Sequence, residues 1–211
     1  MKGNLIIISS PSGGGKGTLI KEILKSVPNI GYSVSYTTRK IREGEENGRH
    51  YFFVSQEKFK ELIEADEFLE FAIVHGNFYG TSINQINAET SIGRDIILEI
   101  DVQGAESVRR KMPEAVSIFI LPPSFEVLEA RLKARATEKD ADLNLRLGNS
   151  YGEVKRFVEF EYVVINDSVE TASADLERII LAERLRRVRQ IDAIRAILSS
   201  FNMSNIDNFG E

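Results

Sequence analysis

The 211-residue chain contains no cysteine, which excludes disulfides, a thiolate zinc site and a cysteine nucleophile. Its two histidines are too few for a histidine-rich metal site. The formal net charge is −5, so any anion binding must be local, through clustered arginines, rather than a property of the whole surface. No apolar run approaches about 18 residues, and the first residues lack a charged region followed by a cleavable apolar segment. We therefore expect a cytoplasmic protein with no membrane and no nucleic-acid partner.

Short apolar segments alternate with segments that have helical spacing, at an apolar content of 42%. This alternation predicts an α/β fold in which helices cover both faces of a parallel sheet. The region from about Ser33 to Thr90 breaks the alternation and is expected to be an inserted lobe. Within that region, Tyr32, Val34 and Tyr36 predict the start of a strand, and HGNFYGT (75–81) predicts a turn. The segment from about Val169 to Phe201 is expected to be helical.

A phosphate-binding loop is predicted by LIIISSPSGGGKGT (5–18), a buried strand followed by glycines, Lys16 and a helix. Glycines allow backbone N–H groups to converge on an anion, the helix N-terminus adds further donors, and the lysine adds a charge. The match to G-x-x-x-x-G-K-[ST] departs at two positions, because Ser10 replaces the first glycine and Gly17 replaces the hydroxyl residue. The alternative is an ordinary tight turn, which would not explain a lysine placed between a buried strand and a helix.

A second signal is the carboxylate that ends the apolar segment IILEID (96–101). Beside a phosphate-binding loop, such a carboxylate helps to hold Mg²⁺, often through water. Asp101 is the stronger candidate, and Glu99 is the alternative.

Four further segments carry a resemblance, namely SVSYTTRKIREGEENGRHYFFV, LEFAIVHGNFYGT, LEIDVQGA and FILPPS. Together with the loop, they closely resemble the guanylate kinase family from about residue 4 to residue 183. The resemblance implies transfer of the γ-phosphoryl group of ATP to GMP, giving ADP and GDP, with Mg²⁺. It also implies a P-loop core (1–32, 91–130 and 160–211), a GMP-binding lobe (33–90) and a lid (131–159).

The family's GMP-site positions fall on these residues: Ser35, Arg39, Arg42, Tyr51, Glu70, Tyr79, Thr81 and Asp101. The chemistry is suitable, because arginines are multidentate partners for a phosphate. Glu70 can accept from guanine N1–H and the exocyclic amino group, while Ser35 and Thr81 can donate to O6.

The ATP positions implied are Ser12, Gly13, Gly14, Gly15, Lys16, Gly17, Thr18, Arg131 and Arg135. The catalytic positions implied are Lys16, Arg39, Arg135 and Arg146, and the Mg²⁺ positions are Asp101 and Thr18, partly through water. Ala136 replaces a glycine that the family usually has after the second lid arginine, and Ile41 replaces a common proline before Arg42.

Two other functions are weighed against this one. A kinase for AMP, CMP or dTMP is disfavoured, because the polar groups of Glu70, Ser35 and Thr81 match guanine. A non-catalytic guanylate kinase-like module that binds phosphopeptides is disfavoured because Lys16 and the lid arginines are present.

Structural hydrogen bonding is expected for His50 and His75, and a solvated surface for the four arginines of residues 184–189. For the oligomeric state, the sequence is compatible with a monomer and with a homodimer.

Overall fold

A computed structural model describes residues 2–74, 76–134 and 140–201. Its centre is a five-stranded, all-parallel sheet with the order β2-β7-β1-β8-β9. The strands are β1 (Leu5–Ser9), β2 (Ile30–Tyr32), β7 (Asp95–Glu99), β8 (Val116–Leu121) and β9 (Tyr162–Ile165). Because β1 is the central strand, the glycine-rich loop that follows it leaves the sheet at the middle of its carboxyl edge.

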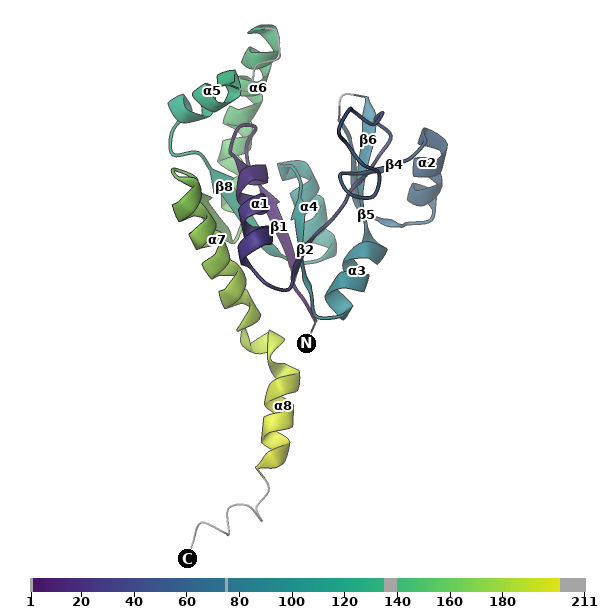
Figure 1. The fold of residues 1–211 in the computed structure, drawn as a ribbon, viewed down its shortest axis with the longest axis vertical. Helices are drawn as coiled ribbons and strands as arrows, with labels where there is room; N and C mark the ends of the chain where they lie inside the picture. The colour runs from purple at the N-terminus through teal and green to yellow at the C-terminus, as the bar shows by residue number, and fades with distance from the viewer. Residues whose placement is uncertain (1, 75, 135–139, 202–211) are drawn as a thin grey trace, which may run out of the picture.

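Helices cover both faces of this sheet, as the alternation predicts (Figure 1). Helices α1 (Lys16–Ser26) and α7 (Val169–Arg184) pack on one face, and α3 (Ile83–Ser91) and α4 (Val102–Lys111) on the other. Successive side chains of a strand point to opposite faces, so Ile6 and Ile8 join one core while Leu5 and Ile7 join the other. Burial on both faces explains why these strands are apolar without alternation.

A second, four-stranded sheet forms the lobe beside the parallel sheet, with the order β4-β3-β6-β5 (Figure 1). Its strands are β3 (Tyr36–Thr37), β4 (Phe52–Phe53), β5 (Phe68–Val74) and β6 (Asn77–Ser82), and α2 (Gln56–Glu64) packs beside them. The strand predicted to begin at Tyr32 is in fact two strands, because β2 ends at Tyr32 in the first sheet and β3 begins at Tyr36 in the second. Residues 33–35 therefore cross from one sheet to the other.

The turn predicted for HGNFYGT is wrong for residues 77–81, which belong to β6. This strand pairs with β3 on one side and β5 on the other, so its backbone groups are satisfied by two neighbours. Gly80 is required there by packing, because a Cβ would lie only 2.9 Å from the ring of Phe59 and 3.0 Å from that of Phe68. Tertiary pairing thus overrides the weak strand propensity of glycine.

The predicted lid (131–159) covers the end of α5 (Phe125–Ala134), α6 (Asp140–Val154) and the 3-10 helix η1 (Lys155–Glu159). Figure 1 shows α5 and α6 on the opposite side of the central sheet from the second sheet. Among the described residues, no helix is long and apolar enough to cross a bilayer.

Most of the segment predicted to be helical from about residue 169 to residue 201 is helical, but it is interrupted, because α7 ends at Arg184. It is followed by the 3-10 helix η2 (Arg187–Arg189) and by α8 (Ile191–Ser200). Arg184 is not a solvated arginine, since its Nε donates to the buried Asp95 at 2.7 Å and its Nη2 to the carbonyl of Pro28 at 2.8 Å. These bonds fix the end of α7 against the amino edge of the sheet.

Candidate active site

The glycine-rich loop has the geometry of an anion cradle. Gly13 and Gly15 have φ angles of +84° and +90°, a conformation that residues with a Cβ rarely adopt. The N–H of Gly14 donates within the loop to the carbonyl of Pro11. Within the described residues, no acceptor takes the N–H groups of Gly13, Gly15, Lys16 and Gly17. Four donors beside the start of α1 are therefore available to a phosphate.

Asn166, just after β9, is hydrogen-bonded to the loop although the two are far apart in the sequence. Its Nδ2 donates to the carbonyl of Gly14 at 2.9 Å, and a Cβ on Gly15 would lie 2.3 Å from that nitrogen. The backbone carbonyl of Asn166 accepts from Nη2 of Arg131 at 2.9 Å. The Nη1 of Arg131 is buried with no hydrogen-bond partner in the described chain, and it lies 3.9 Å from the same Cβ position. Arg131 thus offers the loop an unused cationic donor.

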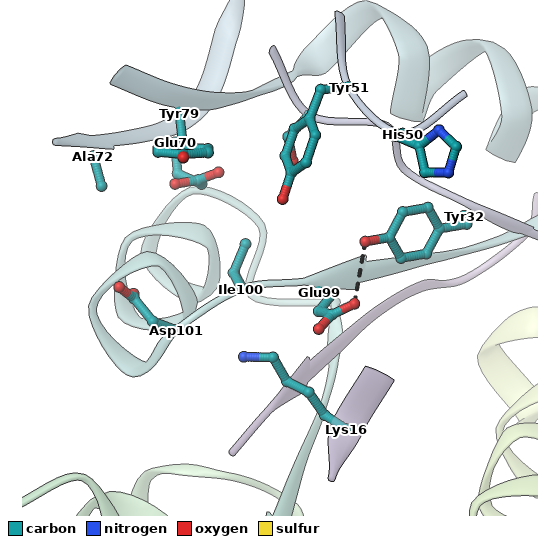
Figure 2. A pocket seen from close by; sticks show the side chains of 11 residues that line it. Lys16, Tyr32, His50, Tyr51, Glu70, Ala72, Tyr79, Glu99, Ile100 and Asp101 are labelled. Carbon is teal, nitrogen blue, oxygen red and sulfur yellow. Dashed lines mark hydrogen bonds between the residues drawn. The ribbon is translucent and has the colours of Figure 1, made fainter. Parts of the chain in front are cut away.

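A pocket of about 330 Å³ lies between the two sheets (Figure 2). It is lined by Lys16, Tyr32, Ser35, His50, Tyr51, Glu70, Ala72, Tyr79, Glu99, Ile100 and Asp101. Lys16 reaches into it from the loop, and Glu70 and Tyr79 reach into it from the second sheet. In the described chain the Lys16 ammonium makes no ion pair, so it is a free cation at one end of the pocket.

A buried carboxylate marks the other end. Glu70 on β5 is paired in register with Thr81 on β6, whose hydroxyl donates to Glu70 Oε1 at 2.6 Å. Burial raises the pKa of Glu70, and the negative charge of Asp101 adds to this, while the Thr81 bond opposes it. A carboxylate held this way gains from any ligand that presents further donors.

The two carboxylates of IILEID point to different parts of the site (Figure 2). Asp101 accepts the N–H of Gly104 at 2.8 Å, so it caps α4 on the side where Glu70 lies. Glu99 is paired in register with Ile8 on the neighbouring strand β1, and its Oε1 is 3.7 Å from the position of a Cβ on Gly17. Glu99 also accepts a hydrogen bond from the Tyr32 hydroxyl at 3.1 Å. Of the two, Glu99 is the carboxylate beside the loop.

Arg39 is held by an acidic partner at the edge of the pocket. Its guanidinium donates to both carboxylate oxygens of Glu45, at 3.0 and 2.7 Å. This pairing lowers the pKa of Glu45 to about 2, and a bond from the backbone N–H of Arg42 contributes. Arg39 also lies over the Tyr51 ring, 5.4 Å from its centroid. The Arg42 side chain is exposed.

The structure therefore brings most predicted residues of the GMP site together. Ser35, Tyr51, Glu70, Tyr79 and Asp101 line the pocket. The others lie around it: Thr81 behind Glu70, and Arg39 and Arg42 on the loop at its edge. Arg135, Ala136 and His75 lie outside the described residues, as does the side chain of Arg146 on α6. His50 makes a structural bond, accepting the N–H of Glu46 at Nδ1, and it also lines the pocket.

Tyr32, Ala72, Ile100 and Asn166 are site residues that the sequence analysis missed. Ala72 is two residues after Glu70 on β5 and therefore shares its face, a spacing that could have placed it in the pocket. Asn166 follows β9, and nothing in the sequence near it indicates that it reaches the loop.

The central strand of the parallel sheet leads into a loop whose backbone N–H groups are available to a phosphate, and this loop faces a pocket between the two sheets. These features define a P-loop kinase that acts on a small phosphorylated acceptor. The comparisons with known proteins agree. The family model described as guanylate kinase matches residues 2–183. A curated guanylate kinase of Neisseria gonorrhoeae is 51% identical over 94% of this chain and 97% of its own length. That of Escherichia coli K12 is 46% identical over 94% and 97%.

A solved structure, that of guanylate kinase from Anaplasma phagocytophilum, superimposes with a TM-score of 0.73 at 34% identity, covering 89% of each chain. The chain belongs to the guanylate kinase family. Its activity is that of an ATP:GMP phosphotransferase, so the two alternatives weighed from the sequence, a different monophosphate kinase and a non-catalytic module, are not supported.

Proposed function

We propose that the loop binds ATP and the pocket binds GMP, so that Lys16 stands between donor and acceptor. The observation that carries this assignment is the position of Lys16, which follows the loop in the chain and lines the pocket in space. The lobe (33–90) supplies most of the pocket's polar side chains, and the lid (131–159) carries the predicted arginines. The core (1–32, 91–130 and 160–211) holds the loop.

Guanine recognition is assigned to the end of the pocket where Glu70 lies. The Watson–Crick edge of guanine presents two adjacent donors, N1–H and the exocyclic amino group, which match the acceptor-only carboxylate of Glu70. Thr81 has one hydroxyl hydrogen and directs it at Glu70, so in this arrangement it positions the carboxylate. Ser35, also in the pocket, is then the donor for O6. Asp101, close to Glu70, is a second acceptor for the amino group.

The GMP phosphate is assigned to Arg39, Arg42, Tyr51 and Tyr79. Arg39 already uses two donors on Glu45, and this bidentate bond fixes the plane of the guanidinium over Tyr51. A fixed guanidinium loses little side-chain entropy when an anion binds. Arg42, on the same loop, is exposed and can reach a phosphate without giving up a buried bond.

The chemistry needs no general base, because the nucleophile is a GMP phosphate oxygen that is already ionised. It forms a bond to the γ-phosphorus of ATP as the bond from that phosphorus to the β–γ bridging oxygen breaks, and ADP leaves. Catalysis then rests on alignment and on neutralising charge around the transferred group. We assign this role to Lys16, which lines the pocket, and to Arg131, whose Nη1 lies 3.9 Å from the Cβ position of Gly15. Arg135 and Arg146 are assigned the same role from their positions in the family motif.

A magnesium site is assigned to Glu99 and Thr18, with Asp101 further away. No group of three or more acidic, histidine or cysteine side chains among the described residues is placed to hold a metal ion. This fits Mg²⁺ bound to ATP, which takes most of its ligands from phosphates and water and only one or two from protein oxygens. Glu99 beside Gly17 offers the hard oxygen donor that such a complex requires. When bound, the ion neutralises the charge that develops on the β- and γ-phosphates.

Glu99→Gln is expected to weaken Mg²⁺ binding about tenfold in the presence of a non-hydrolysable ATP analogue, since second-shell and single-ligand changes typically have this size. Mn²⁺ affinity measured by electron paramagnetic resonance would report it. Asp101→Asn is the comparison, because that carboxylate lies on the guanine side. If Asp101→Asn weakened the metal and Glu99→Gln did not, the original sequence prediction of Asp101 would be correct.

The acceptor assignment is tested by ADP formation in a coupled assay with GMP, AMP, CMP, UMP and dTMP in turn. Turnover with GMP is expected to exceed that with AMP by at least about 10³-fold in kcat/KM, because a site built to bond two donors leaves polar groups unpaired with the wrong base. Comparable turnover with AMP would contradict the role of Glu70.

A further inference from the structure

Both backbone polar groups of Ser12 in the phosphate-binding loop are bonded to side chains of α6. The N–H of Ser12 donates to Oε2 of Glu153 at 2.9 Å, and the hydroxyl of Ser150 donates to the carbonyl oxygen of Ser12 at 3.3 Å. Ser150 is 1% exposed. These contacts join residues 141 and 138 positions apart in the sequence, so they are tertiary contacts rather than part of the loop's own turn.

Neither bond uses the backbone N–H groups of the loop that are available to a phosphate. Among the described residues, no acceptor takes the N–H groups of Gly13, Gly15, Lys16 and Gly17, whereas the Ser12 N–H donates to α6. Glu153 therefore does not compete with ATP for the cradle. Its carboxylate accepts an N–H outside that set, and this bond fixes the start of the cradle, where the chain enters the loop from β1.

The same face of α6 carries backbone position 146, where the sequence predicts a lid arginine. Positions 146, 150 and 153 are separated by four and three residues, the spacing that places residues on one face of a helix. A movement of α6 would therefore displace the loop's anchor together with the backbone position of the lid residue 146. The helix and the loop are joined through two polar contacts on a single residue.

We propose that Ser150 and Glu153 form a clamp on Ser12 that positions the phosphate-binding loop and couples it to α6. This inference rests on the proposed assignment of ATP to the loop. Glu153 and Ser150 are positioning residues, because they act on ATP only through the backbone of Ser12. Without the carboxylate, the Ser12 N–H at the loop's entry loses a charge-assisted bond and the cradle samples other conformations.

Glu153→Ala is expected to raise KM for ATP about tenfold and to change KM for GMP less than about twofold, the size expected for one lost hydrogen bond to a charged group. Glu153→Gln is expected to stay within about twofold of the wild type, because its amide oxygen can still accept the Ser12 N–H. Glu129→Ala on α5, which removes a surface ion pair with Lys133, is the matched control. Equal effects on both substrates, or an alanine variant with wild-type KM for ATP, would overturn the clamp.

Hydrogen exchange on the full chain tests the coupling separately. A non-hydrolysable ATP analogue at saturating concentration is expected to slow amide exchange in residues 147–154 of the wild type, and to have no such effect in Glu153→Ala. Unchanged protection in Glu153→Ala would contradict the coupling. The same experiment distinguishes a failure of the underlying assignment, because an analogue that bound without slowing amide exchange in residues 13–17 would show that the loop is not the ATP site.

Discussion

Replacing Lys16 by alanine is expected to lower kcat about 10²–10³-fold while the melting temperature stays within about 2 °C of the wild type. Removal of one preorganised charge at the reacting group typically has this cost. The side chain makes no ion pair among the described residues and reaches into the pocket from the loop, so the fold does not depend on it. A coupled assay at saturating ATP and GMP measures kcat, and thermal unfolding checks the fold.

Lys21→Ala is the matched control for this substitution, because Lys21 is an exposed lysine on the same helix α1. It is expected to leave kcat unchanged. The effect of Lys16→Ala should appear in kcat more than in KM, since the charge on the transferred group develops in the transition state. An increase confined to KM for ATP would assign Lys16 to ground-state binding alone, and near-normal turnover would remove it from the site.

The phosphate-binding loop could be predicted from sequence because its parts are adjacent in the chain. A glycine run, a lysine and a helix start produce the cradle locally, so one stretch of sequence describes it. The resemblance to a family then located the pocket, since Glu70, Tyr51 and Tyr79 do lie together. What it could not supply was the orientation of each group.

Three features depended on contacts between distant segments. Glu99 rather than Asp101 faces the loop, because strand register places it beside Ile8 while Asp101 has already turned into the cap of α4. Asn166 reaches Gly14 across 152 positions, a contact that no local pattern encodes. The strand β6 exists despite Gly80 because two neighbouring strands pair with it, and propensity alone predicts a turn there.

Glu70→Ala is expected to weaken GMP use by about 1–3 kcal/mol, measured as kcat/KM, and to leave KM for ATP unchanged. The cost is that of two guanine donors left without an acceptor in a buried site.

Glu70 is 8% exposed, and desolvation already raises its pKa, so donors from guanine stabilise the ionised form that the empty site disfavours. It follows that GMP affinity should fall as the pH is lowered through this raised pKa, and that Glu70→Ala should remove that component of the pH profile.

Glu70→Gln separates recognition from packing. Glutamine keeps the size of the side chain and one acceptor, but it presents an amide N–H₂ where the second carboxylate oxygen was, opposite a guanine donor. GMP use by Glu70→Gln should therefore be impaired as much as in the alanine variant, although the cavity is filled. Glu64→Ala, an exposed glutamate on α2, should change neither substrate. If glutamine restored GMP use to the wild-type level, Glu70 would act by supporting Thr81 and the lobe sheet rather than by bonding the base, and the preference for guanine would have to come from Ser35 and Asp101.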